Sequence, residues 1–184
     1  MAKTCLLIVD VQNDFCPGGA LSVREGDRIV PVINRILPQF ELVIATRDTH
    51  PEQTVHFENW PPHCIAGTVG ADFHPDLNVD KIHFFADTGT SDTDDGYSGF
   101  DATNLDLAGV LQEQQVEKLV ICGLATDYCV KATALDAVKH GFHVTVLTDC
   151  IRAVNLHAND GEIALSEMTA AGVHLSTSGS LLSE

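Results

Sequence analysis

Short runs of β-branched and aliphatic residues alternate along this chain with longer segments whose apolar residues recur at helical spacing. This alternation is typical of a parallel sheet covered by helices on both faces, because buried strands need no polar side and parallel strands need long crossover connections. We therefore predict a three-layer α/β/α sandwich with a doubly wound, mostly parallel six-stranded sheet. The predicted strands are residues 4–9, 42–46, 82–85, 118–123, 143–148 and 173–176, and the predicted helices are residues 27–40, 105–115, 127–140 and 158–171.

The length of 184 residues suits one compact domain spanning 1–184, and a hydrophobic content of 45% can fill a core without disulfides. The six cysteines are scattered and form no Cys-x-x-Cys pair, which favours free thiols. The apolar run near the N-terminus is too short for a signal peptide or a membrane span, so we expect a cytoplasmic protein.

The formal net charge is −16 at pH 7. A charge of this sign repels the phosphates of nucleic acids and the heads of anionic lipids, so we predict no nucleic-acid partner and no membrane partner. Solubility is the simplest interpretation of the charge, and acidic residues that serve a metal or a cationic group are the alternative.

Two residues with reactive side chains follow predicted strands, at the sheet edge where doubly wound folds bind ligands. Asp10 comes after a run of apolar residues, so poor solvation should raise its pKa unless a donor or a cation compensates. Cys129 lies at the start of the predicted helix 127–140, where the helix dipole lowers a thiol pKa. Backbone N–H groups there, including those of Ala125 and Cys129, could bind an oxyanion. The alternatives are an Asp10 that caps a turn and a Cys129 that fills the core.

The segment 47–80 has no strong period and is rich in proline, histidine, aspartate and glycine. A loop of this length in a compact domain is usually functional. One carboxylate and three imidazoles in it could hold a borderline divalent metal: Asp48, His50, His56 and His63. Histidines exposed to solvent in a polar loop are the other interpretation.

Six segments that span nearly the whole chain resemble the nicotinamidases of the isochorismatase-like cysteine hydrolase family. They are IVDVQNDFCPGG (8–19), ATRDTHP (45–51), WPPHCIAGT (60–68), GADFHP (70–75), YSGF (97–100) and GLATDYCV (123–130). The WPPHC and YSGF strings separate nicotinamidases from other members of the family, so the resemblance is specific beyond the superfamily level.

The resemblance implies a hydrolase that makes nicotinate and ammonia from nicotinamide through a thioester. In that chemistry Cys129 is the nucleophile, and Asp10 is the general base and acid that carries its proton. The segment Leu124-Ala125 matches a cis peptide bond that helps aim the oxyanion-hole amides of Ala125 and Cys129.

The resemblance also implies ligands for a metal and for a substrate ring. The metal is one divalent ion, zinc or otherwise iron or manganese, on Asp48, His50, His56 and His63. Phe15, Trp60 and Tyr97 match positions that sandwich the ring of a nicotinamide-like amide, and Tyr128 could line the mouth of the pocket. The partner is therefore a small molecule, with a homo-oligomer as a further possibility.

One departure from the family concerns its third catalytic residue, a lysine at the end of the strand before YSGF. That position falls on Thr88, and no lysine or arginine occurs between residues 82 and 117. Without this cation, the pKa of Cys129 should rise and Asp10 should take up a proton more easily. The acidic residues of the surrounding loop would strengthen the effect: Asp87, Asp92, Asp94, Asp95 and Asp101.

Three functions therefore stay open at this point. The first is a nicotinamidase that works without the lysine, because the helix start and the oxyanion donors stabilise the reaction. The second is a related hydrolase of another small amide. The third is a metal- and ligand-binding protein with little turnover, in which Thr88 marks lost catalysis.

Overall fold

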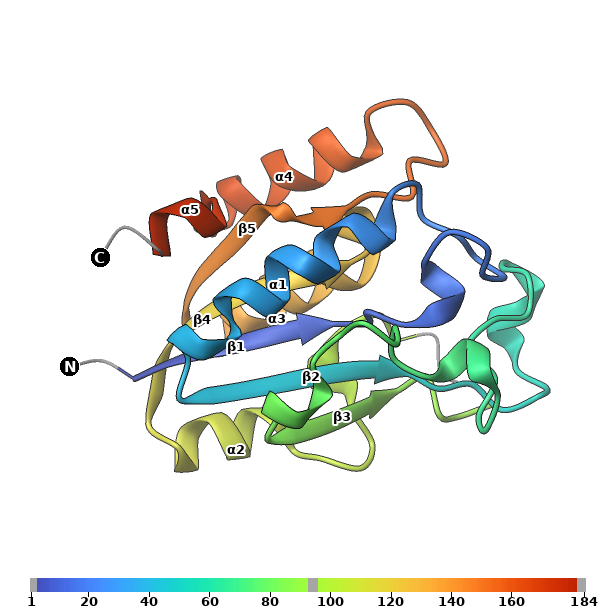
Figure 1. Cartoon of the computed structure of the whole chain (residues 1–184), viewed down its shortest axis with the longest axis horizontal. Helices are drawn as coiled ribbons and strands as arrows, with labels where there is room; N and C mark the ends of the chain where they lie inside the picture. The colour runs from blue at the N-terminus through green and yellow to red at the C-terminus, as the bar shows by residue number, and fades with distance from the viewer. Residues whose placement is uncertain (1–2, 93–95, 182–184) are drawn as a thin grey trace.

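The computed structural model describes residues 3–92 and 96–181, and its strands form one sheet with helices on both sides (Figure 1). The six strands are β1 (Lys3–Val9), β2 (Leu42–Asp48), β3 (Phe84–Thr88), β4 (Val116–Leu124), β5 (His143–Arg152) and β6 (His174–Ser176). Their order in the sheet is β3-β2-β1-β4-β5-β6, and every neighbouring pair is parallel. This order confirms the predicted doubly wound α/β/α sandwich.

The chain reverses its direction of winding between β1 and β4. From β1 it adds β2 and then β3 on one side, and it then crosses to β4, β5 and β6 on the other. In such sheets the crevice for ligands lies beyond the carboxyl ends of the strands at this switch point. Asp10 follows β1 and Cys129 follows β4, so the topology brings both residues to that crevice.

Two apolar layers hold the helices on the sheet. The helices are α1 (Val30–Ile36), α2 (Leu107–Glu113), α3 (Lys131–Lys139), α4 (Asp160–Ala170) and α5 (Ser178–Leu181). Apolar residues of α1, with Leu181 of α5, pack on one face of the sheet, and those of α2, α3 and α4 pack on the other.

The structure corrects several predicted boundaries. The predicted helix 27–40 is a 3-10 turn (Gly26–Ile29), then α1, then a second 3-10 turn (Leu37–Gln39) that contains Pro38. Proline has no N–H to continue an α-helix, which accounts for the change. The strand predicted at 82–85 instead begins at Phe84 and runs to Thr88, because it pairs with β2 as far as Asp48.

Most of the long segment between β2 and β3, cyan to green in Figure 1, folds beyond the carboxyl ends of the strands, and its last part returns to the start of β3. It contains three 3-10 helices, Val55–Glu58, Val69–Ala71 and Val79–Lys81, and a bridge between His50 and Ile65. In the acidic loop after β3, Asp94 and Asp95 lie outside the described residues.

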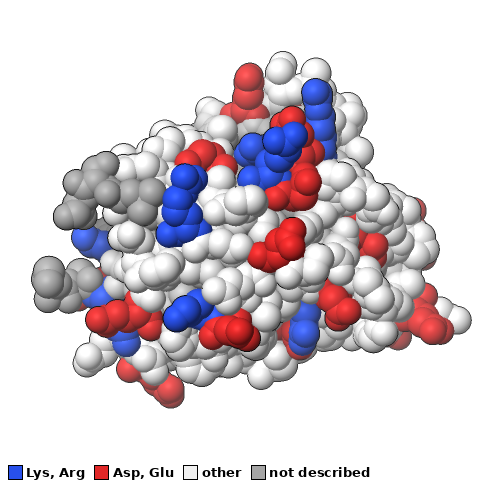
Figure 2. All heavy atoms as spheres, in the orientation of Figure 1, with Lys and Arg blue, Asp and Glu red and all other residues white. Residues whose placement is uncertain are grey.

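The distribution of charge on the surface does not indicate a particular class of partner. On the face shown in Figure 2, basic side chains are scattered among acidic ones. Among residues 3–92 and 96–181, no helix has both the length and the apolar character that a membrane crossing requires. The absence of a nucleic-acid partner and the cytoplasmic location stay predictions.

Gly123 lets β1 and β4 approach each other directly beneath the crevice. Its φ is +121°, and an added Cβ would lie 2.0 Å from the backbone oxygen of Val9. We expect Gly123→Ala to lower the free energy of unfolding by roughly 2–4 kcal/mol, because an L side chain meets both strain and a backbone clash there. Urea denaturation checks this, with Gly141→Ala as the control: Gly141 also has a positive φ, 88°, but nothing within 4 Å of an added Cβ.

Candidate active site

Asp10 occupies the first position after β1 and is almost fully buried, with 1% of its surface exposed. Its φ is +47°, a left-handed conformation that non-glycine residues seldom adopt. The hydroxyl of Thr46 holds it twice, by accepting from the Asp10 N–H at 3.2 Å and by donating to Oδ1 at 2.5 Å. The carboxylate is therefore fixed in direction before any ligand binds.

Cys129 lies in a five-residue π-helical turn, Thr126–Val130, that comes before α3. The carbonyl oxygen of Ala125 accepts hydrogen bonds from the N–H groups of Tyr128 and Val130, both at 3.1 Å. The prediction placed Cys129 in the first turn of an α-helix. The structure confirms the position of Cys129 at the start of a helix, but the turn is π-helical. The peptide bond between Leu124 and Ala125 is cis, as the resemblance implied.

The Cys129 thiol and the Asp10 carboxylate are close enough for each to shift the pKa of the other. Burial, followed by the charges of Asp10 and Asp48, raises the pKa of Cys129 well above its usual value. The rise expected from the missing lysine is confirmed in direction, and the lowering expected from a helix start is wrong, because desolvation and two carboxylates outweigh the dipole of the turn. Burial and Asp48 likewise raise the pKa of Asp10 to about 7, in the direction that the missing lysine predicts.

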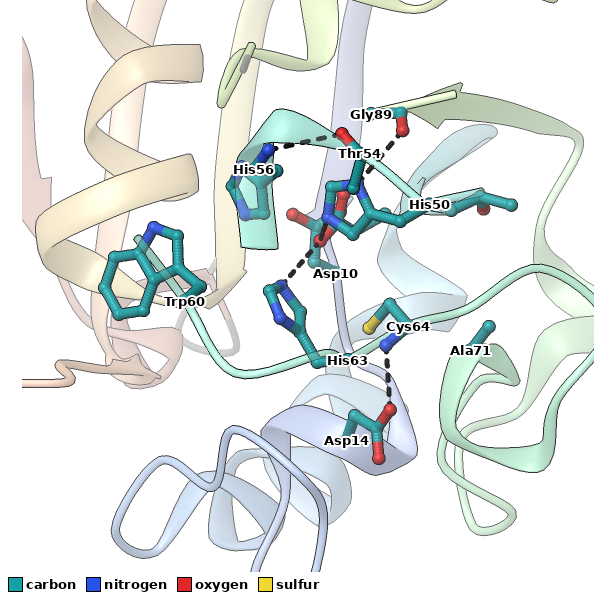
Figure 3. A network of polar contacts seen from close by, with 12 residues as sticks. Asp10, Asp14, His50, Thr54, His56, Trp60, His63, Cys64, Ala71 and Gly89 are labelled. Atoms are coloured by element: carbon teal, nitrogen blue, oxygen red, sulfur yellow. Dashed lines mark hydrogen bonds and ion pairs between the residues drawn. The ribbon is translucent and has the colours of Figure 1, made fainter. Parts of the chain in front are cut away.

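Three buried histidines from different parts of the long segment converge beside Asp10. Each of His50, His56 and His63 offers a ring nitrogen, and these atoms lie within 4.8 Å of one another. Figure 3 shows the three rings turned toward a common space. Asp48 Oδ2 lies 2.9 Å from Nε2 of His50 and 3.4 Å from Nε2 of His63. The sequence prediction named the same four residues.

Backbone carbonyls orient two of these rings. Nδ1 of His50 lies 3.0 Å from the carbonyl oxygen of Gly89, and Nδ1 of His63 lies 2.7 Å from that of Pro61. A carbonyl only accepts, so Nδ1 is the donor in each of these contacts and Nε2 of each ring faces Asp48. Nε2 of His50 is buried, and its neighbouring polar atom is Oδ2 of Asp48. Three imidazoles with one carboxylate suit a divalent metal.

A cavity opens between these groups. Its lining contains the candidate nucleophile, candidate metal ligands and the four aromatic residues singled out from the sequence: Phe15, Leu21, Asp48, His56, Trp60, His63, Gly96, Tyr97, Ala125, Tyr128, Cys129 and Val154. Trp60 Nε1 donates to the Tyr97 hydroxyl at 3.0 Å, and the rings of Trp60 and Tyr128 meet edge to face, with centroids 4.9 Å apart. A flat aromatic ligand suits such walls.

Thr88 is buried at the end of β3, where it is the register partner of Asp48. It is not among the residues that line the cavity. All ten lysines and arginines lie within the described part of the chain, and none of them lines the cavity either. Cys129 therefore interacts with the carboxylates of Asp10 and Asp48 without a lysine or arginine in the lining of the cavity.

The match of this chain to the Isochorismatase domain extends over residues 4–180. The chain belongs to the isochorismatase family. Within that family it is 39% identical over 206 residues to a nicotinamidase of Escherichia coli strain K12, covering 96% of each chain.

Two solved structures of similar proteins carry ligands that bear on this site. A pyrazinamidase of Pyrococcus horikoshii in complex with zinc has 43% identity and a TM-score of 0.86, covering 95% of this chain and 99% of that one. The protein PnC1 from L. infantum in complex with nicotinate has 36% identity and a TM-score of 0.90, with 97% and 94% covered. The isochorismatase fold is therefore shared along nearly the whole chain.

Two residues that support the site were not singled out from the sequence. Thr46 fixes Asp10, yet a threonine inside an apolar strand is simply a good strand former. The buried carboxylate of Asp127 accepts hydrogen bonds from the N–H groups of Val154 and Asn155, at 2.9 and 2.8 Å, and so ties a wall of the cavity to the turn that holds Cys129. Its position beside the nucleophile was the only available signal.

Proposed function

We propose that this chain is a metal-dependent cysteine amidohydrolase that converts nicotinamide and water into nicotinate and ammonia. The observation that carries the proposal is the pairing of Asp10 with Cys129, whose thiol lines a cavity that also contains candidate metal ligands and aromatic walls. The E. coli relative, a nicotinamidase, and the nicotinate-bound structure support the choice of substrate.

In the first half of the reaction, the sulfur of Cys129 attacks the amide carbon while Asp10 takes the thiol proton. The raised thiol pKa favours a proton transfer that accompanies the attack over a preformed thiolate. Backbone N–H groups of Ala125 and Cys129 would bind the oxyanion. Asp10 then gives the proton to the departing nitrogen, so ammonia leaves and a thioester remains.

In the second half, a water molecule attacks the thioester carbon. Asp10, ionised again, takes a proton from the water and returns it to the sulfur as the carbon–sulfur bond breaks. Nicotinate leaves, and the thiol and the carboxylate are ready for the next turnover. The pKa of about 7 lets Asp10 act as base and as acid near neutral pH.

Asp48, His50, His56 and His63 would hold the metal, for which we propose zinc, with iron or manganese as alternatives. When bound, the ion would supply a positive charge and a coordination site for the ring nitrogen of the substrate. The aromatic side chains of Phe15, Trp60 and Tyr97 would bind the faces of that ring, and Tyr128 would lie at the mouth.

The test is incubation of metal-loaded protein with nicotinamide, with ammonia and nicotinate both measured. Equal amounts of the two products, above the background of a Cys129→Ala variant, support the proposal. If only pyrazinamide or another small amide is cleaved, the chain is a related hydrolase. The absence of every product would contradict the proposed reaction.

We also predict about one equivalent of a divalent metal in protein purified without chelators. We expect this because three buried histidines direct ring nitrogens to one place, beside the carboxylate of Asp48. Elemental analysis checks the content, and His56→Ala should lower it. A native chain with less than a tenth of an equivalent, and no gain after incubation with zinc or manganese, would rule the metal centre out.

A second function is favoured by the lack of a lysine or arginine in the cavity lining. Without a cation the thiol holds its proton strongly, and the chain could bind metal and ligand with little turnover. Tight binding of nicotinamide by calorimetry, without ammonia release, would support this binding function over catalysis.

A further inference from the structure

The turn that follows β1 contains a glutamine buried as completely as any core residue. Gln12 has 0% of its surface exposed. Its Nε2 donates to the carbonyl oxygens of Asp48 at 2.7 Å and Ala71 at 2.8 Å, and its Oε1 accepts from the N–H of Asp48 at 2.8 Å. The side-chain amide thus meets both polar groups of the backbone of one metal-binding residue.

These bonds replace a strand that has ended. The register of β1 with β2 ends at Ile8 and Ala45, three residues before Asp48. On its other side, β2 still pairs with β3, where Asp48 is opposite Thr88. The amide of Gln12 therefore occupies the place of a peptide group of β1 and holds Asp48 in the sheet beyond the end of that strand.

Asp14, two residues further on, holds a different part of the site. Its Oδ2 accepts from the N–H of Cys64 at 2.8 Å, as Figure 3 shows, and its Oδ1 accepts from the N–H of Ala20 at 3.0 Å. Cys64 directly follows His63, and its carbonyl oxygen accepts from the N–H of His50 at 2.9 Å. The backbone of Cys64 thus connects Asp14 to His63 and His50, two histidines of the metal centre.

The backbone of Cys64 has an unfavourable conformation. The φ of Cys64 is +46°, in the left-handed region that a residue with a Cβ seldom adopts. Such a conformation persists only where its surroundings hold it, and the bonds to Asp14 and His50 lie on its two sides. Loss of the Asp14 carboxylate should therefore let the segment that carries His63 relax.

Gly70 makes room for the same carboxylate. An added Cβ there would lie 2.1 Å from Oδ2 of Asp14, closer than real Cβ atoms approach other heavy atoms. The φ of Gly70 is not in the left-handed region, so an alanine would be excluded by the clash with Asp14 and not by its own backbone. The absence of a side chain at residue 70 therefore leaves the space that the Asp14 carboxylate occupies.

We propose that Gln12 and Asp14 are positioning residues that set the metal affinity of the site without binding the metal. Gln12 fixes Asp48, and Asp14 fixes His63 and His50 through Cys64. The inference rests on the metal centre proposed above and goes beyond it, because it assigns the rigidity of that centre to the turn after β1. Residues that orient metal ligands typically change affinity by about 10- to 100-fold.

The experiment measures zinc affinity by competition with a chromophoric chelator in native protein, Gln12→Met and Asp14→Ala. Methionine nearly matches the length of glutamine and removes all three bonds. We expect zinc to bind roughly 10–100 times more weakly in each variant. The visible absorption of the Co²⁺-loaded protein is the second readout, since displaced ligands change its band positions, whereas a loss of global stability alone would not.

Two control variants remove similar bonds far from the metal. Asn34 donates to the carbonyl oxygen of Asp76 at 2.6 Å and accepts from the N–H of Asn78 at 2.9 Å, so Asn34→Leu matches Gln12→Met. Asp149 accepts from the N–H and the hydroxyl of Ser178, so Asp149→Ala matches Asp14→Ala. Both controls should keep native zinc affinity and a native Co²⁺ spectrum.

Gly70→Ala provides an independent test that deletes no hydrogen-bonding group. It should displace Asp14 and weaken zinc binding as Asp14→Ala does. In the double variant Gly70→Ala/Asp14→Ala the added methyl group no longer meets a carboxylate. The losses of zinc affinity in the two single variants should therefore not add. Additive losses would show that Gly70 acts by another route and would count against the role of Asp14.

The outcomes separate this inference from the metal centre itself. If native protein binds neither zinc nor manganese, the proposed centre fails and the inference fails with it. If native protein binds zinc tightly and folded Gln12→Met and Asp14→Ala bind it equally well with unchanged spectra, the centre stands and the positioning role is wrong. Should Gln12→Met not fold, the comparison of Asp14→Asn, which keeps one acceptor, with Asp14→Ala decides for Asp14.

Discussion

Cys129→Ala is expected to lower the turnover of nicotinamide by a factor of roughly 10⁴–10⁶, to the level that the remaining binding groups support. The sulfur is the only protein atom in the proposed mechanism that bonds to the substrate carbon, and alanine leaves no replacement for it. A steady-state assay of ammonia release measures the effect, with native and Cys129→Ala protein both loaded with zinc.

The matched control is Cys122→Ala. Cys122 is a fully buried thiol whose pKa burial also raises well above the usual value, but it lies inside β4 in the core. Its loss should lower the free energy of unfolding by about 1 kcal/mol and leave turnover within a few-fold of native. Turnover of Cys129→Ala within tenfold of native, with zinc content unchanged, would show that another group attacks the amide.

The proximity of Asp10 and Cys129 could be predicted because it depends on the topology of the sheet alone. Alternating apolar runs predict a parallel doubly wound sheet, and such a sheet brings the residues after its central strands to one edge. Neither residue needs to be near the other in sequence for this argument. The histidines were predicted as a group from their clustering in one segment, and the structure brings His50, His56 and His63 together.

What holds these residues could not be predicted in the same way. Thr46 and Gln12 act through contacts with residues 36 positions away, and their types are ordinary in a strand and in a turn. The π-helical turn at Cys129 and the end of β3 at Thr88 depend on tertiary pairing, which local patterns do not contain. The missing lysine predicted the direction of the Cys129 pKa, but its main cause, burial beside two carboxylates, is a property of the assembled site.

Thr88→Lys is expected to raise kcat/KM for nicotinamide by about 10- to 100-fold and to move the acid side of its pH profile downward. Thr88 is the register partner of Asp48, and Thr46, which holds Asp10, is two residues before Asp48 on the same side of β2. A lysine at 88 would therefore extend toward both carboxylates. Burial and Asp48 now raise the pKa of Asp10 to about 7.

The sign of the pH shift follows from the charge of each form of Asp10. A nearby cation stabilises the ionised carboxylate, so the pKa of Asp10 falls, by about 1–3 units for a close pair. A base with a lower pKa is ionised at lower pH, so the acid limb of kcat/KM, which reports the free enzyme, should shift in the same direction. The same ammonium would also favour the thiolate of Cys129 during the attack.

Thr88→Met separates charge from volume, because methionine has a comparable unbranched stem and no charge. If the methionine variant shifts the acid limb as the lysine variant does, the cation is not the cause. If the native chain releases no ammonia and Thr88→Lys does, the native protein binds metal and ligand without turnover, and Thr88 is the reason. If Thr88→Lys folds and loads zinc but changes neither rate nor limb, the charges around Asp10 are balanced by another group, and the missing lysine has no consequence for this chain.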